Sequence, residues 1–286
     1  MQHTSPSMRL ISWEHDPRGQ FALEQEKSLL LKMTSHWRRR HRSMLHIECG
    51  TGHFLEVFWG AGFDLSATVS TSEELHRART RIGRRAELHL AQPDHLPFED
   101  NAYDYVLLLT ALDYCSCPEA LLAEAGRVCA KEMLISFLNK HSLYAISMAR
   151  KKHSAHSPRP VTWWSWPSLR LCLLRTLGPK VIRSKYGILP GPYLTWQSST
   201  LCKSINALLC PNIFGAYCAT LVDMTGESIV TPLPAWVKQQ AKTSAPCSNR
   251  VRTHSHPLTY LKALPMLRAE PPHKAAQPSR LHSEQE

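Results

Sequence analysis

The first two thirds of the chain alternates between two periods of apolar residues. Short apolar runs typical of β-strands are separated by segments in which apolar residues recur with helical spacing. The apolar runs lie at 44–47, 65–69, 86–90, 103–109 and 133–138. Strands that alternate with helices at such spacings predict βαβ units, and therefore a doubly wound, mostly parallel α/β sheet.

Local chemistry predicts several boundaries of these elements. An amphipathic helix is expected over 20–37, before the first strand, because its apolar residues share one face. Ser72 precedes two acids, which is typical of a helix N-cap, and Pro118 suits the first turn of a later helix. Further apolar runs at 180–186 and 214–222 predict a sixth and a seventh strand.

The composition is that of a globular protein with a basic surplus. Hydrophobic residues make up 43% of the chain and charged residues 20%, while the formal net charge is +11. Such a charge favours acidic partners, and the run WRRRHR at 37–42 concentrates part of it. A basic run is more often a solvated helix face, so nucleic-acid binding through the basic flanks is kept as a lesser alternative.

The nine cysteines contain no Cys-x-x-Cys pair, and no metal site is predicted from them. Most lie in apolar segments, which is typical of reduced core thiols. The N-terminus lacks the uninterrupted apolar region of a signal peptide, and no run of about 18 apolar residues occurs. The sequence therefore predicts a cytoplasmic protein with no transmembrane segment.

The loop after the first strand has the form of a ligand-binding turn. In MLHIECGTGHFLE (44–56) an apolar strand leads through Gly50 and Gly52 into a helical segment. Glycines let the backbone approach a ligand, and the helix that follows directs free N–H groups toward it. Because parallel strands place their following loops on one edge, Ser70, Gln92 and Thr110 are expected at the same edge of the sheet.

Four segments in order resemble those of one enzyme family. Residues 45–52 resemble the first motif of class I S-adenosylmethionine-dependent methyltransferases, and HLPFEDNAYDYV (95–106) looks like a second segment of that family. Residues 112–114 and 124–128 are similar to two later pieces. The resemblance covers 44–143 and is closest to the small-molecule, type 11 branch. A nicotinamide-type loop would need a third glycine where Leu55 stands, so a dehydrogenase ranks below.

The resemblance implies S-adenosylmethionine as cofactor and a small molecule as methyl acceptor. In the family, an acid after strand two binds the ribose hydroxyls, residues after strand three bind adenine, and the first motif holds the amino-acid end. Carried over to this chain, the candidate cofactor-binding residues are His46, Glu48, Cys49, Gly50, Thr51, Gly52, Ser70, Thr71, Gln92, Pro93, Asp94 and Thr110.

Several of these positions depart from the family pattern. His46 replaces the first acid and Glu48 the first glycine, while Ser70 and Gln92 stand where the ribose and adenine acids belong; Pro93 has no backbone N–H to donate. Each lost charge-assisted hydrogen bond would weaken binding by roughly 10- to 100-fold. Glu48 is a candidate for the carboxylate that His46 lacks, because residues two apart on a strand face the same way.

The resemblance and the composition together predict four segments. They are a helical and basic N-terminal segment (1–43), a cofactor-binding α/β core (44–140), a lid or substrate region that completes the sheet (141–235), and a basic, disordered tail (236–286). Part of the third segment, 189–212, is predicted as an insertion over the ligand-binding edge.

No catalytic residue can be named from the sequence. His141 and Tyr144 follow the fifth strand and could reach a substrate, although a structural role is favoured for both. Aromatic residues could wall an acceptor pocket or pack a lid onto the sheet; they are Trp163, Trp164, Trp166, Tyr193 and Trp196. The predicted function is methyl transfer to a small molecule, and the alternative is a catalytically inactive methyltransferase-fold protein that serves as a binding or scaffold module.

Overall fold

The computed structural model describes residues 16–151, 161–197, 199–206 and 214–225, all within one compact unit. The predicted tail (236–286) and the connector around 153–160 lie outside the described residues. No helix of the described part is long and apolar enough to cross a membrane. A cytoplasmic location stays a prediction from the sequence.

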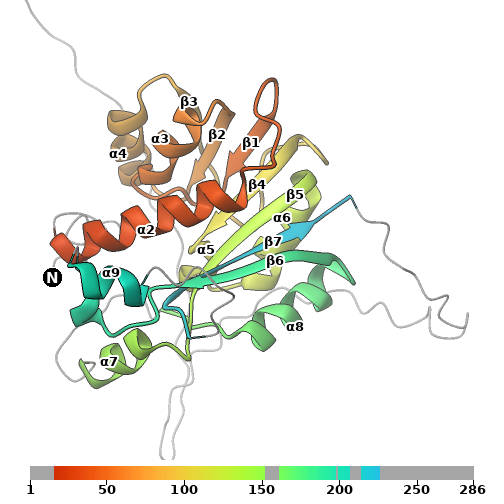
Figure 1. Ribbon diagram of the computed structural model, residues 1–286. Helices are drawn as coiled ribbons and strands as arrows, with labels where there is room; N and C mark the ends of the chain where they lie inside the picture. Colours follow the sequence, from red (N-terminus) through yellow and green to blue (C-terminus); the bar gives the residue numbers. More distant parts are fainter. Residues whose placement is uncertain (1–15, 152–160, 198, 207–213, 226–286) are drawn as a thin grey trace, which may run out of the picture. The chain divides into compact units, whose positions relative to one another are not determined.

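A seven-stranded sheet forms the centre of the described unit, with strand order β3-β2-β1-β4-β5-β7-β6 (Figure 1). Its strands are β1 (Ser43–His46), β2 (Asp64–Val69), β3 (Ala86–Leu90), β4 (Tyr103–Leu109), β5 (Cys129–Leu138), β6 (Val181–Ile188) and β7 (Tyr217–Asp223). The pairs among β1 to β5 are parallel, as predicted, but β7 is antiparallel to both β5 and β6. The sheet is therefore mixed, which refines the predicted mostly parallel arrangement.

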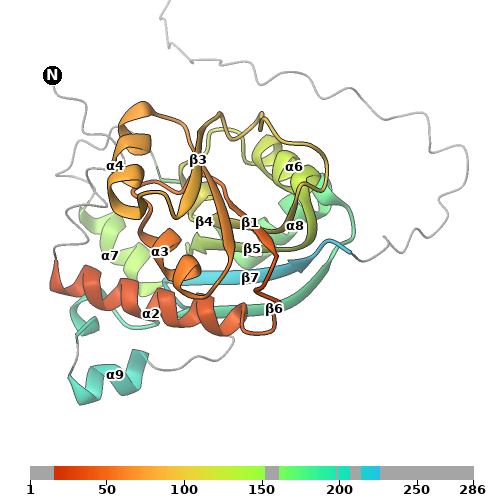
Figure 2. The same cartoon turned by 90° about the horizontal axis from the view of Figure 1, so that it is seen from above.

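Helices cover both faces of this sheet (Figures 1 and 2). They are α2 (Pro17–Met33), α3 (His53–Gly60), α4 (Ser72–Ile82), α5 (Ala111–Tyr114), α6 (Pro118–Val128), α7 (Leu143–Lys151), α8 (Trp166–Leu177), η2 (Tyr193–Thr195) and α9 (Thr200–Asn206). Buried residues of α2, α3 and α4 join one apolar layer, and those of α6 and α8 join the layer on the opposite face.

Alternation along the strands separates these two layers. On β4, Leu107 packs into the layer under α2 and α3, whereas Leu108 packs into the layer under α6 and α8. Leu134 and Ile135 divide in the same way on β5. Each of these fully buried side chains contributes about 1.5–3 kcal/mol. Because both faces are covered, the strand ends are held at fixed positions at the carboxyl edge.

The structure corrects two boundaries that rested on local chemistry. The N-cap of α4 is Thr71 and not Ser72, because the Thr71 side chain accepts a hydrogen bond from the Glu74 N–H at 3.3 Å. The first helix ends at Met33 and not at Trp37. Trp37 is buried through tertiary contacts, since its ring stacks on Tyr105 with centroids 4.2 Å apart.

The region after β5 contains structure that the sequence did not reveal. Helix α7 was not predicted, and the predicted insertion at 189–212 includes the short helices η2 and α9. Helix α2 contacts β6 and β7, and α7 contacts η2. Tyr144 of α7 and Tyr193 of η2 pack against the same apolar layer as α2.

Candidate functional site

The loop after β1 takes a backbone path that needs left-handed conformations. Glu48, Gly50 and Gly52 have φ values of 56°, 55° and 77°. Glycine adopts such angles without penalty, whereas a residue with a side chain is strained there by about 1–3 kcal/mol. The N–H of Glu48 donates to the Thr68 hydroxyl at 3.3 Å, which helps to hold the loop against the end of β2.

The carboxylate of Glu48 is directed to the end of β2. Its Oε1 accepts a hydrogen bond from the Ser70 hydroxyl at 2.6 Å, and both residues are partly exposed. The sequence suggested that Glu48 could replace the acid missing at His46. Glu48 instead carries its negative charge to Ser70, which is the position where the resemblance places the ribose-binding acid.

His46 is buried at the last position of β1. It is 1% exposed, it faces the layer under α2 and α3, and neither ring nitrogen has a hydrogen-bond partner among the described residues. Burial lowers the pKa of the imidazole to about 3, so the ring is neutral at physiological pH. A neutral ring cannot replace the negative charge of an acid, but it can donate or accept one hydrogen bond.

This burial makes His46 a source of acid sensitivity. The unfolded state binds a proton below pH 6.5 and the folded state only near pH 3, so stability is lost as pH falls through this window. Between pH 7 and pH 5 the loss should be about 2 kcal/mol. Urea unfolding of the wild type and of His46→Leu at these two pH values checks the expectation. An equal loss in both proteins would contradict it.

The other residues of the motif loop have defined partners. Thr51 is buried, and its hydroxyl accepts a hydrogen bond from Arg81 of α4 at 3.3 Å. Burial, with the charge of Glu48 second, raises the pKa of the Cys49 thiol to about 12, so this side chain stays protonated. Arg81 also lies 3.5 Å from His53 at the start of α3, which places a positive charge beside the loop.

The predicted adenine-binding segment forms its own turn. The N–H of His95 donates to the Gln92 carbonyl at 3.1 Å, and the side chains of Gln92 and Asp94 are exposed. At the end of β4, Thr110 has a φ of 56° and its N–H donates to the Ser136 hydroxyl at 3.0 Å. The structure thus brings Glu48 and Ser70 into contact. The segment after β3 instead forms a turn with an internal backbone hydrogen bond.

The aromatic residues predicted as a pocket wall divide between the two faces. Tyr144 lies against Trp163, Tyr193 and Trp196, with ring centroids 6.0, 5.9 and 4.8 Å away. Trp164 and Trp166 belong to the opposite layer, where Trp166 meets Phe137 edge to face. His141 is exposed, and its backbone N–H donates to the Asn139 side chain.

Two charged residues had not been singled out from the sequence: Arg81 of α4, which lies beside the motif loop, and Glu26 of the first helix. Glu26 follows Ala22 by four residues and precedes Leu29 by three, so it lies on the buried face of α2. An acid that interrupts an apolar stripe was the available signal.

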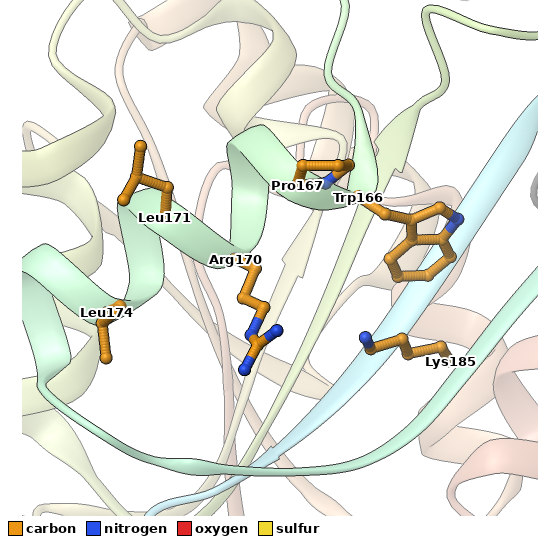
Figure 3. A pocket seen from close by; sticks show the side chains of 6 residues that line it. All are labelled: Trp166, Pro167, Arg170, Leu171, Leu174 and Lys185. Atoms are coloured by element: carbon orange, nitrogen blue, oxygen red, sulfur yellow. The ribbon is translucent and has the colours of Figure 1, made fainter.

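One surface pocket lies away from the motif loop (Figure 3). It is formed by α8 and β6, where Lys185 lies 5.8 Å from the Trp166 ring and Leu171 and Leu174 are about half exposed. None of the predicted cofactor-binding residues lines this pocket. The candidate site is therefore assigned to the carboxyl edge of the sheet.

Comparison with known sequences identifies the domain that contains this edge. Residues 45–137 match the family model described as a methyltransferase domain. An uncharacterized protein of Methanocaldococcus jannaschii is 25% identical over 142 residues, which make up 49% of this chain and 65% of that protein. The chain thus spans less than two thirds of the length of this relative.

Solved structures share the fold at low sequence identity. Magnesium protoporphyrin IX methyltransferase from Synechocystis, determined with bound SAH, has a TM-score of 0.56 and 11% identity, covering 77% of this chain and 95% of its own. A protein of Pyrococcus horikoshii has a TM-score of 0.53 and 14% identity, covering 73% and 92%. Motif loop, strand order and domain match agree, and residues 45–137 of this chain form a methyltransferase domain.

Proposed function

We propose that this protein transfers a methyl group from S-adenosylmethionine to a small-molecule acceptor. The observation that carries the proposal is the hydrogen bond from Ser70 to Glu48, because it holds the Glu48 carboxylate at the end of β2. In the family, an acid at this place accepts hydrogen bonds from the ribose hydroxyls. A carboxylate contributed from the neighbouring loop can accept the same bonds, with the Ser70 hydroxyl holding it in place.

The residues of the carboxyl edge fit this cofactor. The left-handed conformations at Gly50 and Gly52 leave the backbone open to a ligand, and the free N–H groups of α3 follow directly. The ring nitrogens of His46 are buried without a partner, so they offer a hydrogen bond at the amino-acid end. Gln92 would accept a hydrogen bond from the adenine amino group through its amide oxygen. Pro93 has no N–H and would donate none to the adenine ring.

Positioning is the main catalytic contribution that we assign to the protein. When bound, S-adenosylmethionine supplies an electrophilic methyl group. Holding an acceptor atom in line with that group can provide much of the rate enhancement without a dedicated acid or base. Helices α2 and α7 and the turn η2 pack against one face of the sheet, and they would hold the acceptor and exclude water.

A binding experiment tests the assignment of Glu48. S-adenosylhomocysteine should bind the wild-type protein in titration calorimetry, and Glu48→Gln should weaken binding by about 10- to 100-fold because a charge-assisted hydrogen bond is lost. Glu56→Gln is the matched control, since Glu56 is exposed on α3. Equal affinities of Glu48→Gln and Glu56→Gln would refute the role of Glu48.

The second candidate is a methyltransferase-fold protein without catalytic activity. It is favoured by Pro93, which removes one backbone contact to adenine, and by the neutral His46, which removes a negative charge from the first motif. In that case neither S-adenosylmethionine nor S-adenosylhomocysteine would bind, even at millimolar concentration. Mass spectrometry of the native purified protein, searching for a co-purified S-adenosyl ligand, separates the two candidates directly.

A further inference from the structure

Glu26 is a partly buried acid with no counter-charge among the described residues. It lies on the buried face of α2, between Ala22 and Leu29, and burial raises the pKa of its carboxyl to about 8. Its carboxylate forms no hydrogen bond or ion pair with the part of the chain that the structure describes. The side chain is nevertheless partly accessible, so a ligand can reach it. Acidic side chains are rarely buried unless a cation or a hydrogen-bond donor is paired with them.

Two tyrosines from other elements, Tyr144 on α7 and Tyr217 on β7, belong to the apolar layer under α2, the helix that carries Glu26. Burial, and after it the negative charge of Glu26, raises the pKa of Tyr144 on α7 to about 12. The same two causes raise the pKa of Tyr217 at the start of β7. The Tyr217 hydroxyl lies near Ser136 but makes no hydrogen bond of normal geometry within the described residues, although it is almost completely buried. Glu26 and Tyr217 thus lie on two contacting elements, α2 and β7, and both lack a hydrogen-bond partner among the described residues.

Three aromatic side chains, called the aromatic wall below, lie in the same apolar layer; they are Tyr144, Tyr193 and Trp196. Tyr144 packs on Trp196, and Tyr193 lies 5.4 Å from Trp196 in an edge-to-face contact. Tyr193 is tied to the start of α2, because its hydroxyl donates to Asp16 and its ring lies 5.0 Å from the Arg18 guanidinium. The helix that carries Glu26 is therefore held against the wall at its N-terminal end.

We propose that Glu26 and the hydroxyl of Tyr217, bordered by the Tyr144 ring, bind a protonated amino group of the methyl acceptor. An ammonium ion would give Glu26 its missing counter-charge, donate further hydrogen bonds and lie against the faces of aromatic rings, which attract cations. The acceptor class is thus an amine with an apolar or aromatic body. This inference rests on the proposed methyltransferase function.

Binding of a cation here must be linked to proton release. The titratable groups whose pKa values the charge of Glu26 raises are the phenols of Tyr144 and Tyr217, and no cation of the described residues pairs with Glu26. With its raised pKa, the carboxyl holds a proton at neutral pH in the ligand-free protein. An ammonium ligand favours the ionised carboxylate and displaces that proton. Calorimetry in buffers of different ionisation enthalpy detects the released proton.

The test uses the full chain saturated with S-adenosylhomocysteine, with phenethylamine and the neutral 2-phenylethanol as probes. We expect phenethylamine to bind the wild type with proton release. Glu26→Gln should weaken that binding by about 10- to 100-fold and abolish the proton release. Glu24→Gln should change neither, because Glu24 pairs with Lys27 on the exposed side of the same helix. The alcohol should bind more weakly, and its binding should not depend on Glu26.

Several outcomes would overturn the inference. They are absence of phenethylamine binding at millimolar concentration, equal binding of amine and alcohol, and unchanged amine binding in Glu26→Gln. A loss of S-adenosylhomocysteine affinity in Glu26→Gln would assign the carboxylate to the cofactor's own ammonium group and also overturn it. Failure of the wild type to bind S-adenosylhomocysteine would instead refute the proposed function, so the two failures are distinguishable.

Discussion

Replacing Glu26 with glutamine is expected to raise the free energy of unfolding at pH 9 by about 3 kcal/mol. Burial raises the pKa of this carboxyl from 4.5 to about 8, which corresponds to about 5 kcal/mol at 1.36 kcal/mol per unit. The remaining contact of the side chain with solvent reduces this value. Glutamine has the same shape and no charge, so the variant avoids the cost of burying an ionised group.

The sign of the effect sets the pH window for the measurement. Between pH 4.5 and pH 8 the folded protein holds the Glu26 proton more tightly than the unfolded chain does. The contribution of Glu26 to the free energy of unfolding is therefore largest below pH 4.5 and is lost as pH rises through 8. Urea unfolding at pH 5 and pH 9 should show this loss in the wild type and in Glu24→Gln, but not in Glu26→Gln. Parallel curves for all three proteins would contradict the expectation.

A stabilised Glu26→Gln variant would bear on the role of this residue. An acid that weakens the fold at physiological pH is expected where function needs it, because stability and activity often conflict at functional sites. If the variant is more stable and no longer binds an amine, the cost of burying Glu26 is explained by recognition of the acceptor.

Gly215→Ala is expected to destabilise the fold by about 3 kcal/mol, since the added methyl group meets the backbone of a neighbouring strand. A Cβ at this position would lie 2.6 Å from the Gly187 carbonyl carbon and 2.6 Å from the Ile188 nitrogen. Backbone atoms in a paired strand cannot move aside as a flexible side chain can. Gly215 also accepts a hydrogen bond from the Asn139 side chain, which would be strained by any shift.

Gly60→Ala is the matched control for this substitution. A Cβ at Gly60, the last residue of α3, has no neighbour within 4 Å. Alanine there should leave stability unchanged or raise it by up to about 1 kcal/mol, because it restricts the unfolded chain and favours the helix. Denaturant unfolding of both variants separates the steric effect at Gly215 from the general effect of losing a glycine. A similar small change in both would argue against close packing of the chain at Gly215.

The predicted site shows which parts of function could be foreseen. The glycines of the first motif were recognisable because a strand, a tight turn and a helix must follow one another in sequence. The partner of Glu48 was not predictable, because Ser70 lies 22 residues away and the direction of a strained side chain depends on the backbone angle of the loop. The sequence argument expected the Glu48 carboxylate to stand in for the acid missing at His46, whereas in the structure this carboxylate accepts a hydrogen bond from Ser70.

Local patterning alone determined the parallel core of this protein. Strands β1 to β4 and helix α6 follow from the spacing of apolar residues and from a proline at the first turn, since both act within a few residues. Tertiary structure alone decided what depends on contacts between distant segments. It reversed β7 beside β5, buried His46 without a hydrogen-bond partner among the described residues, and packed α2, which carries Glu26, in the layer of Tyr144 and Tyr217. The spacing of apolar residues indicates which face of an element is buried. The charges and hydrogen-bond partners around a buried group come from other elements, which the spacing does not reveal.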